Sequence, residues 1–200
     1  MTEIILATHN EHKVEEINAL LEGVPVHFVS LKEKGYFEEI LETGATFDEN
    51  ARLKASTIGA IFGQMTLADD SGLEVDALHG APGVFSARYA GAGATPEQLC
   101  QKLLIALKDV PYELRTARFR CVMALFDPQT QVCHLVEGAV EGRITDSMRG
   151  HHGFGYDPVF EVIETGRTMA EMPPYEKNSI SHRFRAVEKI KERLLEYPFY

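Results

Sequence analysis

Met65-Thr66-Leu67-Ala68-Asp69-Asp70-Ser71-Gly72 is an apolar run that ends in two adjacent carboxylates and a Ser-Gly turn. The pattern predicts a strand whose end presents acids at a sheet edge, where a metal ion or substrate can reach them. A solvated turn is the alternative, because Asp, Ser and Gly are ordinary turn residues. Neighbouring strand residues point to opposite faces, so only one acid can aim into a site unless the strand has already broken. We expect Asp70 to be that acid and Asp69 to support it by binding the loop or a lysine.

Length and composition indicate a globular protein of one domain, spanning residues 1–200. Of its 200 residues, 44% are hydrophobic and 25% charged, which suffices for a substantial core. The apolar runs are strand-sized and fall short of the roughly 18 residues of a membrane span. The segment from Met1 to Thr8 has neither a basic leader nor a secretion signal. We therefore expect a cytoplasmic protein with no membrane partner.

Charge and cysteine content exclude further classes. A formal net charge of -10 argues against a nonspecific nucleic-acid binder, which normally presents a basic face. An acidic protein that binds a polyphosphate needs concentrated Lys and Arg residues and a divalent cation to overcome repulsion. The widely spaced Cys100, Cys121 and Cys133 fit neither a disulfide framework nor a zinc site. We expect them to be buried, reduced thiols.

Hydrophobic periodicity predicts alternating strands and helices. The expected strands are 4–7, 24–31, 65–70, 117–125, 132–144 and 159–160; the expected helices are 14–21, 47–61, 95–107 and 184–195; loops are expected at 32–44 and 80–94. Strand 117–125 is apolar on both faces, which is typical of a central strand, and a turn at 127–130 pairs it with 132–144. The chain is therefore predicted to have an α/β fold with a mixed sheet flanked by helices.

Three helix starts have capping signals. Thr46 with Glu49 matches a capping box, Thr95 precedes a proline at the first helical position, and Ser181 can cap the last helix.

The first candidate site is Thr8-His9-Asn10-Glu11-His12-Lys13, where a strand leads into a helix. The free N–H groups of a helix's first turn favour an anion, and Lys13 adds a counter-charge, so the segment suits phosphate. It lacks the glycines of a P-loop. An ordinary helix cap at Asn10 with a solvated Lys13 is an equal alternative.

The second candidate pairs Glu42 with Asp70 as ligands of one Mg²⁺. This ion prefers oxygen ligands and typically uses one or two carboxylates plus substrate phosphates. Glu42 lies in a loop rich in glutamate, so a solvated surface residue is the alternative.

The third candidate is the segment from His151 to Pro158. Glycines on either side of Phe154 free the backbone around an aromatic ring, which suits a stacked nucleobase, and Asp157 can accept hydrogen bonds from that base. The alternative is a tight turn that packs Phe154 and Tyr156 into the core.

The fourth candidate runs from Glu176 to Arg183 and concentrates Lys177, His182 and Arg183 at a helix start. Cations there oppose the helix dipole unless an anion or polar ligand compensates. A functional site is therefore a better interpretation than a generic run of charge, although a nearby glutamate is an alternative partner.

Five segments, taken in chain order, resemble the motifs of the inosine triphosphate pyrophosphatase family, which removes deaminated purine nucleotides. They are Thr8-His9-Asn10 with Lys13; Ala68-Asp69-Asp70-Ser71-Gly72; Gly80-Ala81-Pro82-Gly83 with Ser86-Ala87-Arg88-Tyr89; Gly153 to Pro158; and Glu176-Lys177-Asn178 with Ser181-His182-Arg183. The resemblance covers nearly the whole chain. It implies a homodimer of two-lobed α/β subunits, each with a long central sheet and an active-site cleft between the lobes.

The resemblance also implies roles for individual residues. Thr8, His9, Asn10, Glu11, His12 and Lys13 are expected to cradle the phosphates, with Lys54 and Lys177 as further contacts; Glu42 and Asp70 to hold Mg²⁺; Ser71 to line the same edge; Phe154, Gly155, Tyr156 and Asp157 to stack on and read the base; and His182 and Arg183 to contact its oxygen. At His9, Glu11 and His12 the side chains are bulkier than glycine, and the backbone is expected to make most of the contact.

The implied reaction is Mg²⁺-dependent hydrolysis of inosine, deoxyinosine and xanthosine triphosphates to the monophosphate and pyrophosphate. Water attacks the α-phosphorus, with Asp70 as the base or the water-positioning residue. The 6-oxo group of the base accepts hydrogen bonds and therefore suits a donor such as Arg183. The 6-amino group of adenine is itself a donor and cannot accept from Arg183.

One alternative is a pyrophosphatase with another base preference. The other alternative is a regulator that binds nucleotides without hydrolysing them. The carboxylates argue against a regulator, because acids near a triphosphate weaken its binding unless a metal ion is bound.

Overall fold

The computed structural model describes residues 2–196, except for the side chains of His12 and Glu196. The chain folds into two compact units. The first unit comprises Met1–Asp70, Cys121–Gly138 and Arg183–Tyr200, and the second unit comprises Ser71–Arg120 and Ala139–His182. Each unit therefore combines stretches that are far apart in the sequence. None of the helices in the described part of the chain is long and apolar enough to cross a membrane.

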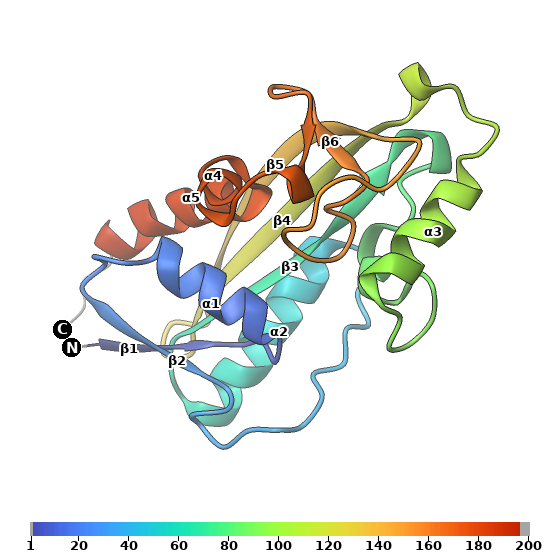
Figure 1. The fold of residues 1–200 in the computed structure, drawn as a ribbon. Helices are drawn as coiled ribbons and strands as arrows, with labels where there is room; N and C mark the ends of the chain where they lie inside the picture. The colour runs from blue at the N-terminus through green and yellow to red at the C-terminus, as the bar shows by residue number, and fades with distance from the viewer. Residues whose placement is uncertain (1, 197–200) are drawn as a thin grey trace. The chain divides into compact units, whose positions relative to one another are not determined.

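The strands of residues 2–196 form one seven-stranded sheet in the order β2-β1-β3-β4-β5-β6-β7 (Figure 1). Their bounds are β1 Thr2–Leu6, β2 Val26–Ser30, β3 Thr66–Val75, β4 Thr116–Asp127, β5 Val132–Ile144, β6 Phe160–Val162 and β7 Arg167–Thr168. β1 is parallel to β2 and β3, whereas β6 is antiparallel to β5 and β7, so the sheet is mixed. The predicted α/β fold is confirmed, and β4 lies at the middle of the strand order, as its apolar faces predicted.

Helices flank the sheet and begin at recognisable caps. Their bounds are α1 Glu11–Leu20, α2 Phe47–Phe62, α3 Pro96–Ala106, α4 Pro174–Ile180 and α5 His182–Glu196. Thr95 and Gln98 form a capping box at α3. Thr46 caps α2 by accepting from the Glu49 N–H at 3.2 Å, but the Glu49 carboxylate accepts from the Ala45 N–H and not from the cap residue. The capping box predicted at Thr46 is therefore only half formed.

In the first unit, helices lie on both faces of the sheet (Figure 1). One face has a hydrophobic core made of Ile4, Leu6, Leu67, Cys121, Met123 and Leu125 from the strands, Ile17 and Leu21 from α1 and its end, and Ala186, Val187, Ile190 and Leu194 from α5. On the other face α2 packs closely, because a Cβ placed on Gly59 would lie 2.5 Å from Cδ1 of Phe126. Strand alternation puts Asp69 on the face of Leu67 and Asp70 on the opposite face.

The second unit has a core of its own. It consists of Leu73 and Val75 from β3, Leu99, Cys100, Leu103 and Leu107 from α3 and its end, Ala117, Phe119, Val140 and Ile144 from β4 and β5, and Tyr156, Val159, Phe160, Val162, Met169 and Met172 from the later segments. All three cysteines are free; Cys100 and Cys121 are buried as predicted, whereas Cys133 is half-buried.

Two local predictions were wrong. The strand was expected to end at the acid pair, but β3 continues through Asp69, Asp70, Ser71 and Gly72 to Val75. The residues after the acids keep the ladder because Leu73 and Val75 are fully buried and anchor the strand in the second core. The glycine-rich stretch predicted as a loop contains a 3₁₀ helix, Gly83–Arg88.

Replacing Gly59 by alanine tests the contact between α2 and β4. Alanine favours a helix over glycine by about 1 kcal/mol, so replacing a helical glycine by alanine stabilises a protein where nothing lies near the new methyl group. Here the new methyl group meets the Phe126 ring, and we expect Gly59→Ala to lower the free energy of unfolding by about 1–3 kcal/mol, measured by urea denaturation. The loss should shrink in a Phe126→Leu background, where the ring is gone. A more stable Gly59→Ala protein would contradict the close packing.

Candidate active site

Asp69 lies in a buried ion cluster on the α1–α5 face of the first unit. Its Oδ2 is 2.8 Å from Nζ of Lys13 and 3.5 Å from Nη2 of Arg183, whose guanidinium also pairs with Glu16. Burial by itself raises the pKa of Asp69, but Lys13 and Arg183 outweigh it and hold that pKa well below its usual value. Asp69 therefore stays ionised and fixes the Lys13 ammonium, which agrees with the supporting role expected for it.

The predicted phosphate segment lies at the N-terminus of α1. Asn10 caps the helix by accepting from the Lys13 N–H at 3.3 Å, and Thr8 Oγ1 accepts from the Asn10 N–H at 3.2 Å. Capping at Asn10 was the alternative interpretation; the solvated Lys13 that accompanied it is not found, because its ammonium pairs with Asp69. The first N–H groups of a helix lack intrahelical partners, so this end retains donors besides the capped one.

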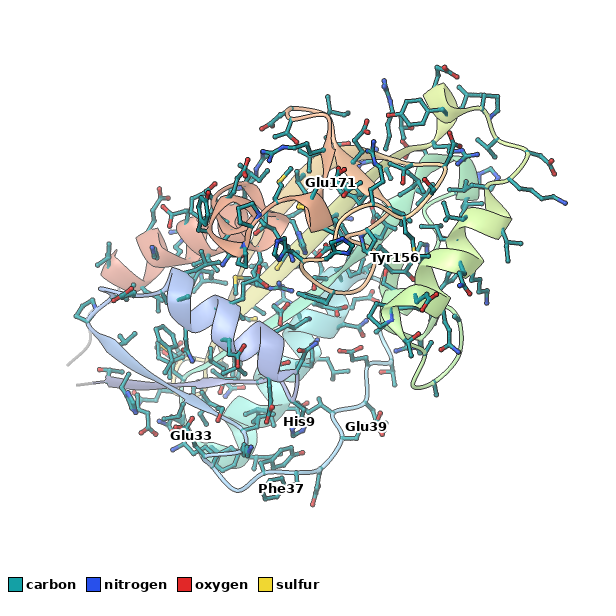
Figure 2. All side chains as sticks on the ribbon, viewed as in Figure 1. His9, Glu33, Phe37, Glu39, Tyr156 and Glu171 are labelled. Atoms are coloured by element: carbon teal, nitrogen blue, oxygen red, sulfur yellow. The ribbon has the colours of Figure 1, made fainter. Side chains whose placement is uncertain are left out.

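Neighbouring side chains tie this segment to the loop after β2. Figure 2 shows His9 beside the loop that includes Phe37 and Glu39. The ring of His9 stacks on Tyr36 with centroids 6.1 Å apart, and its Nε2 lies 2.8 Å from the Glu38 carbonyl oxygen. Glu11 forms an exposed ion pair with Lys32 at 3.1 Å. The side chain of His12 lies outside the described part of the chain.

Asp70 lies on the α2 face, where Lys54 joins it to Glu42. Nζ of Lys54 is 2.6 Å from Oε1 of Glu42 and 3.4 Å from Oδ1 of Asp70. Burial lowers the pKa of Lys54, but Asp70, Asp69 and Glu42 outweigh it, so the net change is upward and the ammonium stays charged. Burial raises the pKa of Asp70, against the attraction of Lys54. The structure therefore brings together the two carboxylates that the sequence paired only by hypothesis.

The residues around Asp70 suit a hard cation. The side chain of Asn50 lies close enough to Asp70 to counteract the rise that burial causes in its pKa, although in the described part of the chain neither Nδ2 of Asn50 nor the buried Oδ2 of Asp70 has a partner in standard hydrogen-bond geometry. No group of three or more Asp, Glu, His or Cys side chains able to hold a metal occurs in that part. Two converging carboxylates with one unused oxygen fit Mg²⁺, which completes its coordination with water and substrate phosphates.

In the second unit, Phe154, Asp157 and Lys177 form a compact group. Oδ2 of Asp157 accepts from the Phe154 N–H and from Nζ of Lys177, each at 2.8 Å. The same ammonium lies 4.5 Å from the centroid of the Phe154 ring. Gly153 has a φ of 79°, and a Cβ there would lie 1.9 Å from Oδ2 of Asp157, so glycine is required for this close turn. These contacts hold the backbone of the turn that carries the half-buried Phe154 ring.

The remaining residues predicted to read the base have structural contacts. The buried Tyr156 belongs to the second core, and its hydroxyl donates to the Ser86 carbonyl at 2.8 Å. Gly155 accepts from the thiol of Cys100 at 3.4 Å. His182 stacks on Phe119 with centroids 5.0 Å apart. Ser71 follows Asp70 within β3 and is half-buried.

Lys177, His182 and Arg183 do not share one helix start, so that prediction was wrong. Lys177 lies in the last turn of the short α4, where a cation suits the helix dipole, and His182 and Arg183 open α5 after the intervening Ser181. The break comes at Ser181, whose extended backbone (ψ 157°) ends α4. The unfavourable arrangement that made this segment a candidate is therefore absent for Lys177.

Sequence reasoning missed two residues of these clusters, Glu16 and Asn50. Both are polar and buried on helix faces that pack against the sheet. Glu16 follows Lys13 by three positions and Asn50 precedes Lys54 by four, so each lies on the same helix face as a lysine that the sequence analysis named as a candidate phosphate contact. A polar residue among apolar residues on such a face is the sequence feature that could have identified Glu16 and Asn50.

Comparison with known proteins gives consistent matches over nearly the whole chain. A family model described as "Ham1 family" matches residues 4–193. A protein of Geobacter sulfurreducens named dITP/XTP pyrophosphatase is 50% identical over 97% of this chain and 97% of its own length. A Bacillus licheniformis protein of the same name is 51% identical over 97% of this chain and 98% of its own length. The structure of a HAM1 protein from Coxiella burnetii superposes with a TM-score of 0.92 at 44% identity, covering 98% of this chain and 100% of that one.

Asp69→Asn tests the buried ion cluster. Removing one partner leaves Arg183 and Lys13 incompletely compensated, so we expect the free energy of unfolding at neutral pH to fall by about 3–5 kcal/mol. Because the native pKa of Asp69 is lowered, its contribution is complete above the ordinary pKa near 4 and is lost as the pH falls below it. The variant should therefore lose less stability than the wild type between about pH 4 and pH 2.

The control is Asp109→Asn, whose side chain is 88% exposed. We expect it to change stability by less than about 0.5 kcal/mol and to retain the wild-type pH dependence. Equal stability of Asp69→Asn and this control at neutral pH would refute the structural role of the cluster.

Proposed function

The chain belongs to the Ham1 family, and we propose that it hydrolyses its substrate at the bond between the α- and β-phosphates with Mg²⁺ held by Glu42 and Asp70. It is a hydrolase that acts on nucleoside triphosphates, and its substrates are non-standard purine nucleotides such as dITP and XTP, for which its relatives are named. The monophosphate and pyrophosphate are the products.

The observation that supports this proposal most directly is the convergence of Glu42 and Asp70 on one ammonium group. Two carboxylates from separate segments contact Nζ of Lys54, so the fold already collects negative charge around a single cation. When bound, Mg²⁺ supplies a Lewis acid that neutralises phosphate charge and lowers the pKa of a coordinated water. Asp70 is also the catalytic residue of the proposal, since its buried carboxylate can position the attacking water.

Lysines and the start of α1 are proposed to bind the phosphates. The Nζ of Lys13 lies 2.8 Å from Oδ2 of Asp69, which orients the lysine side chain. The backbone N–H of Lys13 donates to the side chain of Asn10, the residue that caps α1. Helix N-termini favour anions. Thr8 to Lys13 supply this binding mainly through backbone groups, and Lys54 adds a second positive charge.

Recognition of the base is proposed for the group around Phe154. An aromatic ring offers a stacking surface worth about 1–3 kcal/mol per base, and Asp157 and Lys177 provide an acceptor and a cation beside it. His182 and Arg183 stay proposed contacts of the 6-oxo group. For Arg183 such a contact requires the guanidinium to exchange Glu16 or Asp69 for the base. Tyr156 is proposed to act through packing.

The cellular setting is part of the proposal. Free thiols at Cys100, Cys121 and Cys133 support a reducing compartment such as the cytoplasm. A homodimer, proposed from the family resemblance, can be tested by measuring the mass of the protein in solution.

Asp70→Asn tests the catalytic assignment. The variant keeps the shape of the side chain but loses the charge that a cation needs, so we expect it to remain folded and to lose about 10²–10⁴-fold in turnover. The measurement is Mg²⁺-dependent release of pyrophosphate from dITP and XTP, with circular dichroism as the check on folding. Asp109→Asn, an exposed aspartate, is the matched control and should keep wild-type turnover. Turnover of Asp70→Asn near that of the control would remove Asp70 from the mechanism.

Substrate choice is tested by comparing inosine, xanthosine, guanosine and thymidine triphosphates under the same conditions. We expect pyrophosphate from the inosine and xanthosine nucleotides at rates well above those of the other two. Equal rates on all four would contradict selectivity for deaminated purines.

A further inference from the structure

Lys54 occupies the position between the two carboxylates that the proposed function assigns to a metal ion. We propose that Lys54 is an exchangeable counter-ion: it holds Glu42 and Asp70 together in the metal-free protein and transfers to the phosphates when the metal and the triphosphate bind. The inference rests on the proposed function. Its consequence is that a divalent cation binds weakly by itself and more tightly together with a triphosphate.

The first argument is geometric. Nζ of Lys54 contacts Oε1 of Glu42 at 2.6 Å and Oδ1 of Asp70 at 3.4 Å, and the Lys54 and Asp70 side chains are 7% and 9% exposed. A divalent cation bound by the same two carboxylates lies close to Nζ of Lys54 even if it uses their other oxygens. Lys54 and the metal therefore compete for the same pair of negative charges.

The second argument concerns charge. The buried Asp70 carboxylate and the half-buried Glu42 carboxylate contact the same ammonium group, and their negative charges repel each other unless a cation lies between them. Lys54 supplies that cation in the metal-free protein. A metal ion placed beside an ammonium that stayed in position would experience repulsion, which is large at a few ångströms inside a protein.

The third argument concerns the placement of Glu42. This residue lies in an irregular loop, whereas Lys54 is near the middle of α2. The loop returns to the helix at Gly44, whose N–H donates to Oδ1 of Asn50 at 2.8 Å. Lys54 thus holds the Glu42 carboxylate from a rigid element, which keeps the ligand in place before the metal arrives.

The fourth argument is that Lys54 can move without disturbing the fold. A lysine has a flexible four-carbon stem and a compact charge. Triphosphate oxygens offer it a new set of anionic partners. By thermodynamic reciprocity, a triphosphate that draws Lys54 away raises the affinity for metal, and the metal raises the affinity for triphosphate by the same factor.

The test measures Mn²⁺ binding without turnover, by calorimetry and electron paramagnetic resonance. Mn²⁺ alone is titrated into the wild type, Lys54→Met, Lys54→Arg and the surface control Lys108→Met, whose lysine side chain is 71% exposed. We expect Lys54→Met to bind Mn²⁺ at least about tenfold more tightly than the wild type, because the competing charge is removed. Lys54→Arg and Lys108→Met should bind as weakly as the wild type.

A second measurement covers the case in which Lys54→Met is unstable without metal. Ligands that bind only the folded state raise the melting temperature, so Mn²⁺ should raise that of Lys54→Met by more than it raises that of the wild type. Adding the α,β-methylene analogue of dITP should tighten Mn²⁺ binding to the wild type and have a smaller effect in Lys54→Met.

The outcomes separate this inference from the proposed function. If Lys54→Met binds Mn²⁺ no more tightly than the wild type while Asp70→Asn abolishes binding, the exchange is refuted and the metal site stands. If Asp70→Asn and Glu42→Gln bind Mn²⁺ as the wild type does in the presence of the analogue, the metal site is refuted, and the exchange with it.

Discussion

The alternation of side chains along β3 is the constraint on which the rest of the site depends. Asp69 and Asp70 are consecutive residues of a continuous strand, so they point to opposite faces of the sheet. Asp69 meets Lys13 and Arg183 on the face covered by α1 and α5, and Asp70 meets Lys54 on the face covered by α2. One dipeptide thereby organises two charge clusters that do not compete for the same acid.

The two acids respond differently to similar burial. Both lose hydration, which raises a carboxyl pKa, but Asp69 has two close cations and its pKa falls, whereas Asp70 faces Lys54 together with the like charge of Glu42 and its pKa rises. Asp69 is therefore suited to a permanent structural charge. Asp70, with a less compensated charge and an oxygen that lacks a hydrogen bond, is suited to binding a cation.

Some local structure was predictable because its cause lies in neighbouring residues. Thr46, Thr95 and Asn10 cap helices as their types and spacing indicate. The end of β3 was not predictable in this way, since Asp, Ser and Gly are ordinary turn residues, and the strand continues only because Leu73 and Val75 enter a second core. Local preference was outweighed there by burial. A start of the last helix after Ser181 was predicted, whereas the short helix α4 before it, which holds Lys177, was missed.

The amino-acid sequence by itself determined the α/β class, the central position of β4, the placement of Asp69 and Asp70 on opposite faces of their strand, and the family, because periodicity and ordered motifs are properties of neighbouring residues. Only the tertiary structure decided which charges meet. The contacts of Lys54 with Glu42 and Asp70, and of Arg183 with Glu16 and Asp69, join residues that are distant along the chain. Such pairings depend on how helices pack on the two faces of the sheet, and no spacing in the sequence encodes that packing.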